Sequence, residues 1–130
     1  MTLDLDDLQH FLLTRTPALA ARYEFLSFPD AARGRAWLSG ILEKVGTARA
    51  VGSSTLDARW VTVAFTWSGL RALGVDEGSL ATFPEEFRQG MAARAKMLGL
   101  TGANGPERWA GGLTGPDLHA IVVLFARDVM

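Results

Sequence analysis

The chain has 130 residues, of which 48% are hydrophobic and 21% are charged, so it is long enough to bury the core of one folded domain. Its formal charge of -1 provides no excess positive potential, and we expect neither nucleic acid nor a membrane surface as a partner. There are no cysteines and only two histidines, which excludes thiol catalysis, disulfides and thiolate metal sites.

The N-terminal sequence MTLDLDDLQHFLL is acidic where a secretory signal is basic, and the chain contains no apolar run long enough to span a membrane. We therefore expect a cytoplasmic protein. Leu8, Phe11 and Leu12 follow a helical spacing before Pro17. This pattern predicts a short helical stretch within an N-terminal arm, residues 1–20.

Three strands and a helix are predicted in the first half of the chain. ARYEFLSF (21–28) is rich in aromatic residues and precedes a Pro-Asp start signal, which predicts a strand. Residues 29–45 carry an apolar stripe at helical spacing and predict an amphipathic helix. Residues 46–67 contain a short strand, a Gly-Ser-Ser turn and a stronger strand with alternating Val61, Val63 and Phe65, which predicts a hairpin.

The second half of the chain begins with two helices and ends with a strand. Residues 68–75 predict a short helix stopped by Gly74, and residues 82–98 predict a longer helix ended by Gly99. A glycine-dense loop follows, and the apolar run 118–126 predicts the last strand.

The order strand, helix, strand, strand, helix, strand is that of an α+β, ferredoxin-like split βαβ fold. We predict a single ferredoxin-like domain over residues 1–130, with a four-stranded antiparallel sheet and the helices on one face. In the last strand His119, Ile121, Val123 and Phe125 alternate with residues that are also apolar. Because helices can cover only one face, we expect the other to bind a second domain or a second copy of the chain.

The stretch ATFPEEFRQGMAARA (81–95) places the carboxylates of Glu85 and Glu86 near Arg88 at a helix start. Thr82 and Glu85 match a capping box, and the proline between them fits the first turn. The alternative is a general base beside Arg88, but adjacent helical residues point about 100° apart and cannot flank one substrate atom. We therefore predict a capped helix start rather than a catalytic pair.

Both histidines are weighed as functional residues. His119 could bind a haem iron or carry protons, but its place at the start of an apolar strand favours a structural histidine bonded to a loop. His10 lies next to Phe11 in the N-terminal arm, and we expect it to be partly exposed.

Three other features are weighed in the same way. The loop GLTGANG (99–105) resembles a phosphate cradle only superficially, because no helix follows it and it lacks a lysine, so we interpret it as a connector. Asp4, Asp6 and Asp7 are interpreted as a solvated acidic turn, with a cation site as the alternative. Four tryptophans could line an aromatic pocket, but their periodicity favours a place in the core: Trp37, Trp60, Trp67 and Trp109.

Three stretches resemble the N-terminal half of the dye-decolourising (DyP-type) haem peroxidases: VTVAFTWSGLRALGV, SLATFPEEFRQGMAARAKMLGLTGANGPERW and GGLTGPDLHAIVVLFA. The resemblance implies two ferredoxin-like domains in a full-length protein, and haem as the cofactor. It also implies a proximal histidine in the C-terminal domain, and a distal aspartate, in a Gly-x-x-Asp-Gly motif, with a distal arginine.

None of the catalytic residues that the family implies can be placed on this sequence. Gly-x-x-Asp-Gly is absent, and in the nearest string, GVDEG (74–78), Asp76 stands at the wrong position. His119 lies in the fourth predicted strand and does not match the proximal ligand, and Arg88 matches a helix position rather than the distal arginine. We therefore assign no catalytic, cofactor-binding or metal residue.

Two functional hypotheses remain. The first is the N-terminal domain of a DyP-type peroxidase without the haem-binding half, which has a structural role and binds the C-terminal peroxidase domain through its open sheet face. We expect this chain alone to bind no haem and to have no peroxidase activity. The alternative is a stand-alone homodimeric α+β module that binds a small hydrophobic ligand, haem or a protein partner at that face.

Overall fold

The computed structural model describes residues 2–13, 20–49, 59–111, 113 and 115–126. The strands are β1 (Ala20–Leu26), β2 (Arg59–Phe65) and β3 (Ala120–Ala126), and the helices are α1 (Ala31–Ile41), α2 (Trp67–Ala72), α3 (Glu77–Ala81) and α4 (Glu85–Arg94). Short 3-10 helices cover His10–Leu12, Leu42–Lys44, Gly102–Asn104 and Pro106–Arg108. The predicted α+β class is confirmed.

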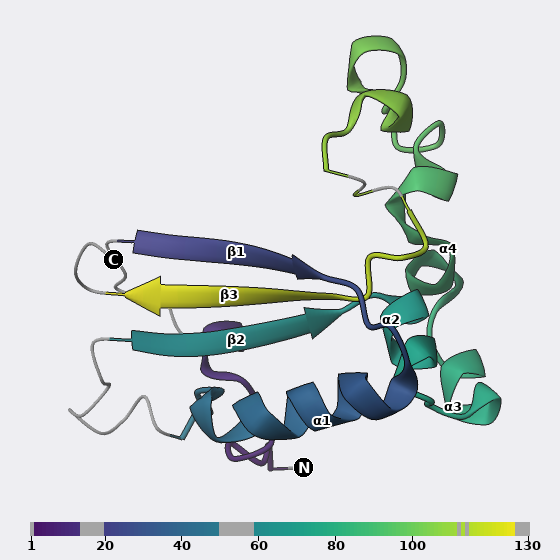
Figure 1. Ribbon diagram of the computed structural model, residues 1–130. Coiled ribbons are helices and arrows are strands. Elements are labelled where there is room, and N and C mark those ends of the chain that lie inside the picture. The colour runs from purple at the N-terminus through teal and green to yellow at the C-terminus, as the bar shows by residue number, and fades with distance from the viewer. Residues whose placement is uncertain (1, 14–19, 50–58, 112, 114, 127–130) are drawn as a thin grey trace. The chain divides into compact units, whose positions relative to one another are not determined.

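The three strands form one antiparallel sheet in the order β1-β3-β2, so the last strand in sequence lies in the middle (Figure 1). The short first strand of the predicted hairpin is not shown among the described residues, and part of that hairpin, residues 50–58, lies outside them. Val45 pairs with Val61 as an isolated parallel bridge, whereas a hairpin requires antiparallel pairing. The ferredoxin-like sheet is therefore not confirmed, and the placement of the helices on one face stays a prediction.

Polar residues just before three of the helices cap them, as the start signals require. Asp30 Oδ1 accepts a hydrogen bond from the amide of Arg33 at 2.8 Å, where α1 begins. Thr66 Oγ1 accepts one from the amide of Gly69 at 2.9 Å and caps α2. Asp76 caps α3 in the same way. Helix α3 is missing from the sequence prediction because five residues are too few to produce a periodic pattern.

The helix predicted over 82–98 differs from the structure in two respects. Thr82 Oγ1 donates to the carbonyl of Ser79 at 2.7 Å and so belongs to the end of α3, while Pro84 is the residue before α4. The predicted capping box is therefore wrong, although Glu85 does lie in the first turn of α4. Gly90 interrupts α4 with a φ of 73°, a conformation that favours glycine.

The chain divides into two compact units. The first comprises residues 1–24, 37–64 and 121–130, and its core is aromatic. Trp60 stacks on Phe125 with 5.7 Å between ring centroids, and the ring of His10 meets Trp60 edge-on at the same distance. His10 is only 2% exposed, so the expected partial exposure is wrong. Burial lowers the pKa of His10.

The N-terminal arm pairs with the outer edge of β2 through a glutamine side chain. Gln9 Nε2 donates to the carbonyl of Val63 at 2.8 Å, and Gln9 Oε1 accepts from the amide of Val63 at 2.9 Å. The hydroxyl of Thr62 donates to the same oxygen. The side-chain amide thus occupies the positions that a neighbouring strand would take, which satisfies backbone groups at this edge.

The second unit comprises residues 25–36 and 65–120. Helix α2 contacts α3 and α4, and Leu80 of α3 is 1% exposed. Gly69 brings α2 so close to the start of β3 that an added Cβ would lie 2.6 Å from the carbonyl carbon of His119. No helix among the described residues has the length and apolar character needed to cross a membrane. The single-domain assignment stays a prediction.

Candidate functional site

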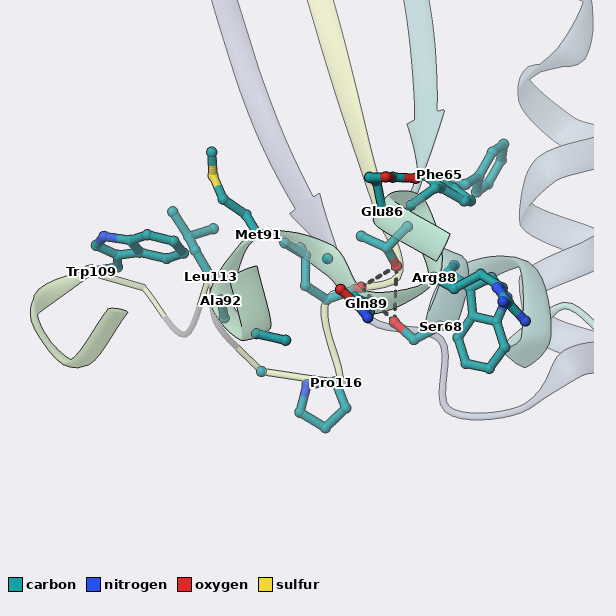
Figure 2. A pocket seen from close by; sticks show the side chains of 17 residues that line it. Phe65, Ser68, Glu86, Arg88, Gln89, Met91, Ala92, Trp109, Leu113 and Pro116 are labelled. Carbon is teal, nitrogen blue, oxygen red and sulfur yellow. Dashed lines mark hydrogen bonds between the residues drawn. The ribbon is translucent and has the colours of Figure 1, made fainter. Parts of the chain in front are cut away.

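The second unit contains a pocket of about 740 Å³ (Figure 2). Its walls come from the end of β2, the start of α2, both halves of α4, and residues 109, 113, 115, 116 and 118. Most of the lining side chains are aromatic or aliphatic, and the largest of them are Phe65, Trp67, Phe87 and Trp109. The volume is within the range of small-molecule sites, and the lining also includes the charged side chains of Glu86 and Arg88.

Two hydroxyl groups form the polar corner of this pocket. Thr66 Oγ1 donates to the carbonyl of Leu118 at 2.6 Å and lies 2.9 Å from Ser68 Oγ, which reaches the same carbonyl at 3.3 Å. A hydroxyl whose proton is held by a carbonyl is a poor nucleophile, and no histidine lines the pocket to act as its base. The corner therefore suits binding and orientation rather than covalent catalysis.

The carboxylates of Glu85 and Glu86 have separate partners. Glu85 Oε1 accepts from Gln89 Nε2 at 2.7 Å, while Glu86 Oε1 lies 3.4 Å from Arg94 Nη1. Glu86 and Arg88 contribute to the pocket wall, and Glu85 does not. The two carboxylates thus do not converge on one point, in agreement with the interpretation as a helix start.

The histidines do not fit the role of a haem ligand. His119 Nδ1 accepts a hydrogen bond from the amide of Phe28 at 2.8 Å, so the proton of its neutral ring is on Nε2. A metal-bound histidine has the opposite arrangement, in which the nitrogen away from the metal donates a hydrogen bond. His10 is enclosed in the core of the first unit beside Trp60. We therefore derive no chemistry through haem for this chain.

The tryptophans divide between core and pocket. Trp60 is 5% exposed, as expected for a core residue, whereas Trp67 and Trp109 line the pocket and Trp37 is half-buried. The guanidinium of Arg71 lies 5.5 Å from the ring centroid of Trp67. Trp109 Nε1 donates to a backbone carbonyl in the glycine-rich segment, at 3.1 Å.

The acidic residues have structural partners. Asp6 pairs with Arg49 at 2.6 Å, which raises the pKa of the guanidinium. Asp76 is exposed, and its hydrogen bonds to Ser79 lower the pKa of the carboxyl. In the part of the chain that the structure describes, no three carboxylate or imidazole side chains form a group that could hold a metal ion. In the loop 99–105, Gly99 and Gly102 adopt positive φ, which explains two of its glycines.

Solved structures share this fold. A fungal DyP-type peroxidase from Auricularia auricula-judae superposes with a TM-score of 0.79 at 22% identity, over 98% of this chain and 28% of the other. The peroxidase DyP2 from Amycolatopsis gives 0.78 at 23% identity, over 95% and 27%. An ancestral D-type dye-decolorizing peroxidase gives 0.77 at 25% identity, over 97% and 28%.

The chain has the fold of one part of the dye-decolorizing peroxidases. It spans about 28% of the length of these solved relatives, and the resemblance seen in its sequence is confirmed at the level of the fold. One DyP-type relative is a peroxidase with an engineered heme pocket. No family model and no curated protein matches the chain.

The sequence did not point to the pocket, because its walls come from three separate stretches of the chain. One local signal was present: Thr66 stands three residues before Gly69 in TWSG, a spacing at which a hydroxyl caps a helix. This pattern could have located the polar corner, although not the apolar walls around it.

Proposed function

We propose that the chain is a partial DyP-like domain with a structural role, which completes a haem-bearing partner domain and has no peroxidase activity alone. The observation that carries the proposal is the coverage: nearly all of this chain superposes on little more than a quarter of each peroxidase. The hydrogen bond that His119 Nδ1 accepts supports the lack of activity, because it fixes the ring in an orientation unlike that of a metal ligand.

The proposed partner surface is the apolar face of the sheet. Tyr23 and Phe25 on β1 are 58% and 52% exposed, which is high for aromatic side chains on a strand. Aromatic side chains of this kind are enriched at protein interfaces, so their exposure supports a partner that covers them.

A peroxidase assay tests this role. The purified chain is mixed with haem, hydrogen peroxide and a reducing dye, and the rate is compared with that of the same concentration of free haem. We expect the two rates to be equal, and a Soret band no different from that of free haem. A rate clearly above that of free haem would refute the proposal, and loss of that rate in His119→Ala would assign it to this histidine.

A second candidate function is the binding of a small hydrophobic ligand, and the pocket in the second unit favours it. The apolar walls and the two hydroxyls of Thr66 and Ser68 fit a molecule with an aromatic body and one polar end. Titration with the fluorescent probe anilinonaphthalene sulfonate measures this binding.

Two methionines provide matched variants for that titration. Met91 lines the pocket, whereas Met97 is 72% exposed and does not line it. We expect Met91→Glu to weaken probe binding about tenfold, because it places a charge against an anionic ligand in an apolar site, and Met97→Glu to leave binding unchanged. Equal effects of the two substitutions would show that the probe binds elsewhere.

A further inference from the structure

The two edges of the sheet differ in what lies beside them. At the β2 edge, Val45 forms a parallel bridge and the side chain of Gln9 bonds to the backbone of Val63. At the β1 edge, by contrast, no strand or bridge is found among the described residues (Figure 1). An uncovered edge presents a row of amides and carbonyls that can pair with another strand.

The hydrogen bond between β1 and β3 shows which backbone groups of β1 point outward. The amide of His119 donates to the carbonyl of Leu26 at 2.8 Å, so Leu26 directs its backbone groups toward β3. Along a strand these directions alternate from one residue to the next. The amides and carbonyls of Ala21, Tyr23 and Phe25 therefore point to the open edge.

These outward groups fit an antiparallel pairing of β1 with itself. If Tyr23 lies opposite Tyr23 of a second copy, Ala21 lies opposite Phe25, and all three positions use their outward backbone groups. The register also places a small side chain opposite a large one. An antiparallel pair centred on one residue is two-fold symmetric, which is the geometry of a closed dimer.

In the same register each Arg22 lies opposite Glu24 of the second copy. Within one chain these side chains already form an ion pair, with 2.5 Å between Arg22 Nε and Glu24 Oε1, and they are 69% and 39% exposed. They occupy the positions between the hydrogen-bonded pairs, where side chains from the two strands are closest. The strand AARYEFL is thus complementary to itself in charge as well as in size.

We propose that two copies of this chain pair through their β1 strands, antiparallel and centred on Tyr23, and so form one continuous six-stranded sheet. The pairing uses the edge of the sheet and not its face. It is therefore independent of the proposed structural role beside a haem-bearing domain, and either proposal can fail without the other.

Charge substitutions test the register. Arg22→Glu makes both cross-strand pairs acidic, Glu24→Arg makes both basic, and the double variant R22E/E24R restores opposite charges with their places exchanged. We expect each single substitution to raise the dimer Kd about tenfold or more, and the double variant to return it to within a few-fold of the original. Sedimentation velocity over a range of concentrations measures these constants, and circular dichroism checks that each variant is folded.

A mixture of the two single variants gives the sharpest result. Each alone is expected to be mainly monomeric, while the mixture forms a heterodimer, because its two cross-strand pairs are again of opposite charge. Fluorescence anisotropy of labelled R22E titrated with E24R detects this, and high salt should weaken it. The control is Arg33→Glu, which makes the same charge change on α1 at a side chain that is 76% exposed.

Three results would overturn the pairing: a chain that is monomeric at all concentrations, a dimer that responds equally to Arg22→Glu and Arg33→Glu, or a mixture that does not associate. The second of these would indicate a dimer through another surface, such as the sheet face. Peroxidase activity in the assay described above would refute the structural role and leave the edge pairing intact.

Discussion

Gly69 in α2 lies against the backbone of His119, and replacing it with alanine tests whether this contact fixes α2 within the second unit. The new Cβ would be 2.6 Å from the carbonyl carbon and 2.9 Å from the Cα of His119, and closer still to the carbonyl oxygen. Backbone atoms cannot rotate away as a side chain can. Either α2 or the start of β3 must therefore move.

The expected loss of stability follows from three terms. Forcing a methyl group into packed surroundings costs about 1–3 kcal/mol. The movement also breaks the hydrogen bond from the amide of Thr66 to the carbonyl of His119, 3.1 Å long, which contributes about 1 kcal/mol. Alanine stabilises the helix by about 1 kcal/mol relative to glycine, because its helix propensity is higher. Gly69→Ala should therefore lower the free energy of unfolding by about 1–3 kcal/mol.

Gly40 in α1 provides the matched control, because an added Cβ there meets no atom within 4 Å. Gly40→Ala should raise the free energy of unfolding by about 0.5–1 kcal/mol, through helix propensity alone. Urea denaturation followed by circular dichroism measures both variants. If Gly69→Ala proves as stabilising as Gly40→Ala, α2 does not lie against the backbone of His119, and the reasoning is refuted.

Three further substitutions probe the cap of α2, the buried imidazole and the break in α4. Thr66→Ala should lower the free energy of unfolding by about 1–2 kcal/mol, because α2 loses its cap and the carbonyl of Leu118 loses its hydroxyl donor. Thr66→Ser keeps the hydroxyl and should retain most of the original stability in the same urea experiment. Because burial lowers the pKa of His10, the folded state binds fewer protons than the unfolded state. The contribution of His10 to the free energy of unfolding is then complete above the unfolded pKa of about 6.5, and it is lost as the pH falls toward the lower folded pKa. His10→Phe should remove this pH dependence, which denaturation curves between neutral and mildly acidic pH measure. Gly90→Ala should lower the unfolding free energy by about 1–3 kcal/mol, since the φ of 73° suits glycine alone, and a neutral result would mean that α4 is continuous.

Sequence patterns located the elements whose signals are local. The aromatic run before Pro29 predicted β1, the start signal at Asp30 predicted α1, and the apolar run 118–126 predicted β3. In each case the residues within one element carry the information, since periodicity and caps depend on neighbours in sequence.

Features that depend on distant residues could not be predicted in this way. His10 is polar and next to an exposed phenylalanine in sequence, and nothing local indicates that it packs against Trp60. The capping box at Thr82 matched its pattern, but the same hydroxyl caps the end of a helix that the sequence did not reveal. The pocket could not be predicted for the same reason, because its walls come from residues far apart in sequence that meet only in the folded chain.

The hydrogen bonds of the Gln9 side chain at the β2 edge have a consequence for how copies of this chain would assemble. In the proposed β1 pairing, Gln9 satisfies the backbone of Val63 at the other edge of the described sheet, so this edge adds no further copy. Substituting Gln9 would free the amide and carbonyl of Val63, beyond the bridge that Val45 makes to Val61, and each subunit could then join one neighbour on either side. Such chains have no natural end, and the expected product is an open filament rather than a pair. In the proposed pairing, Gln9 is thus the residue that limits assembly to two copies.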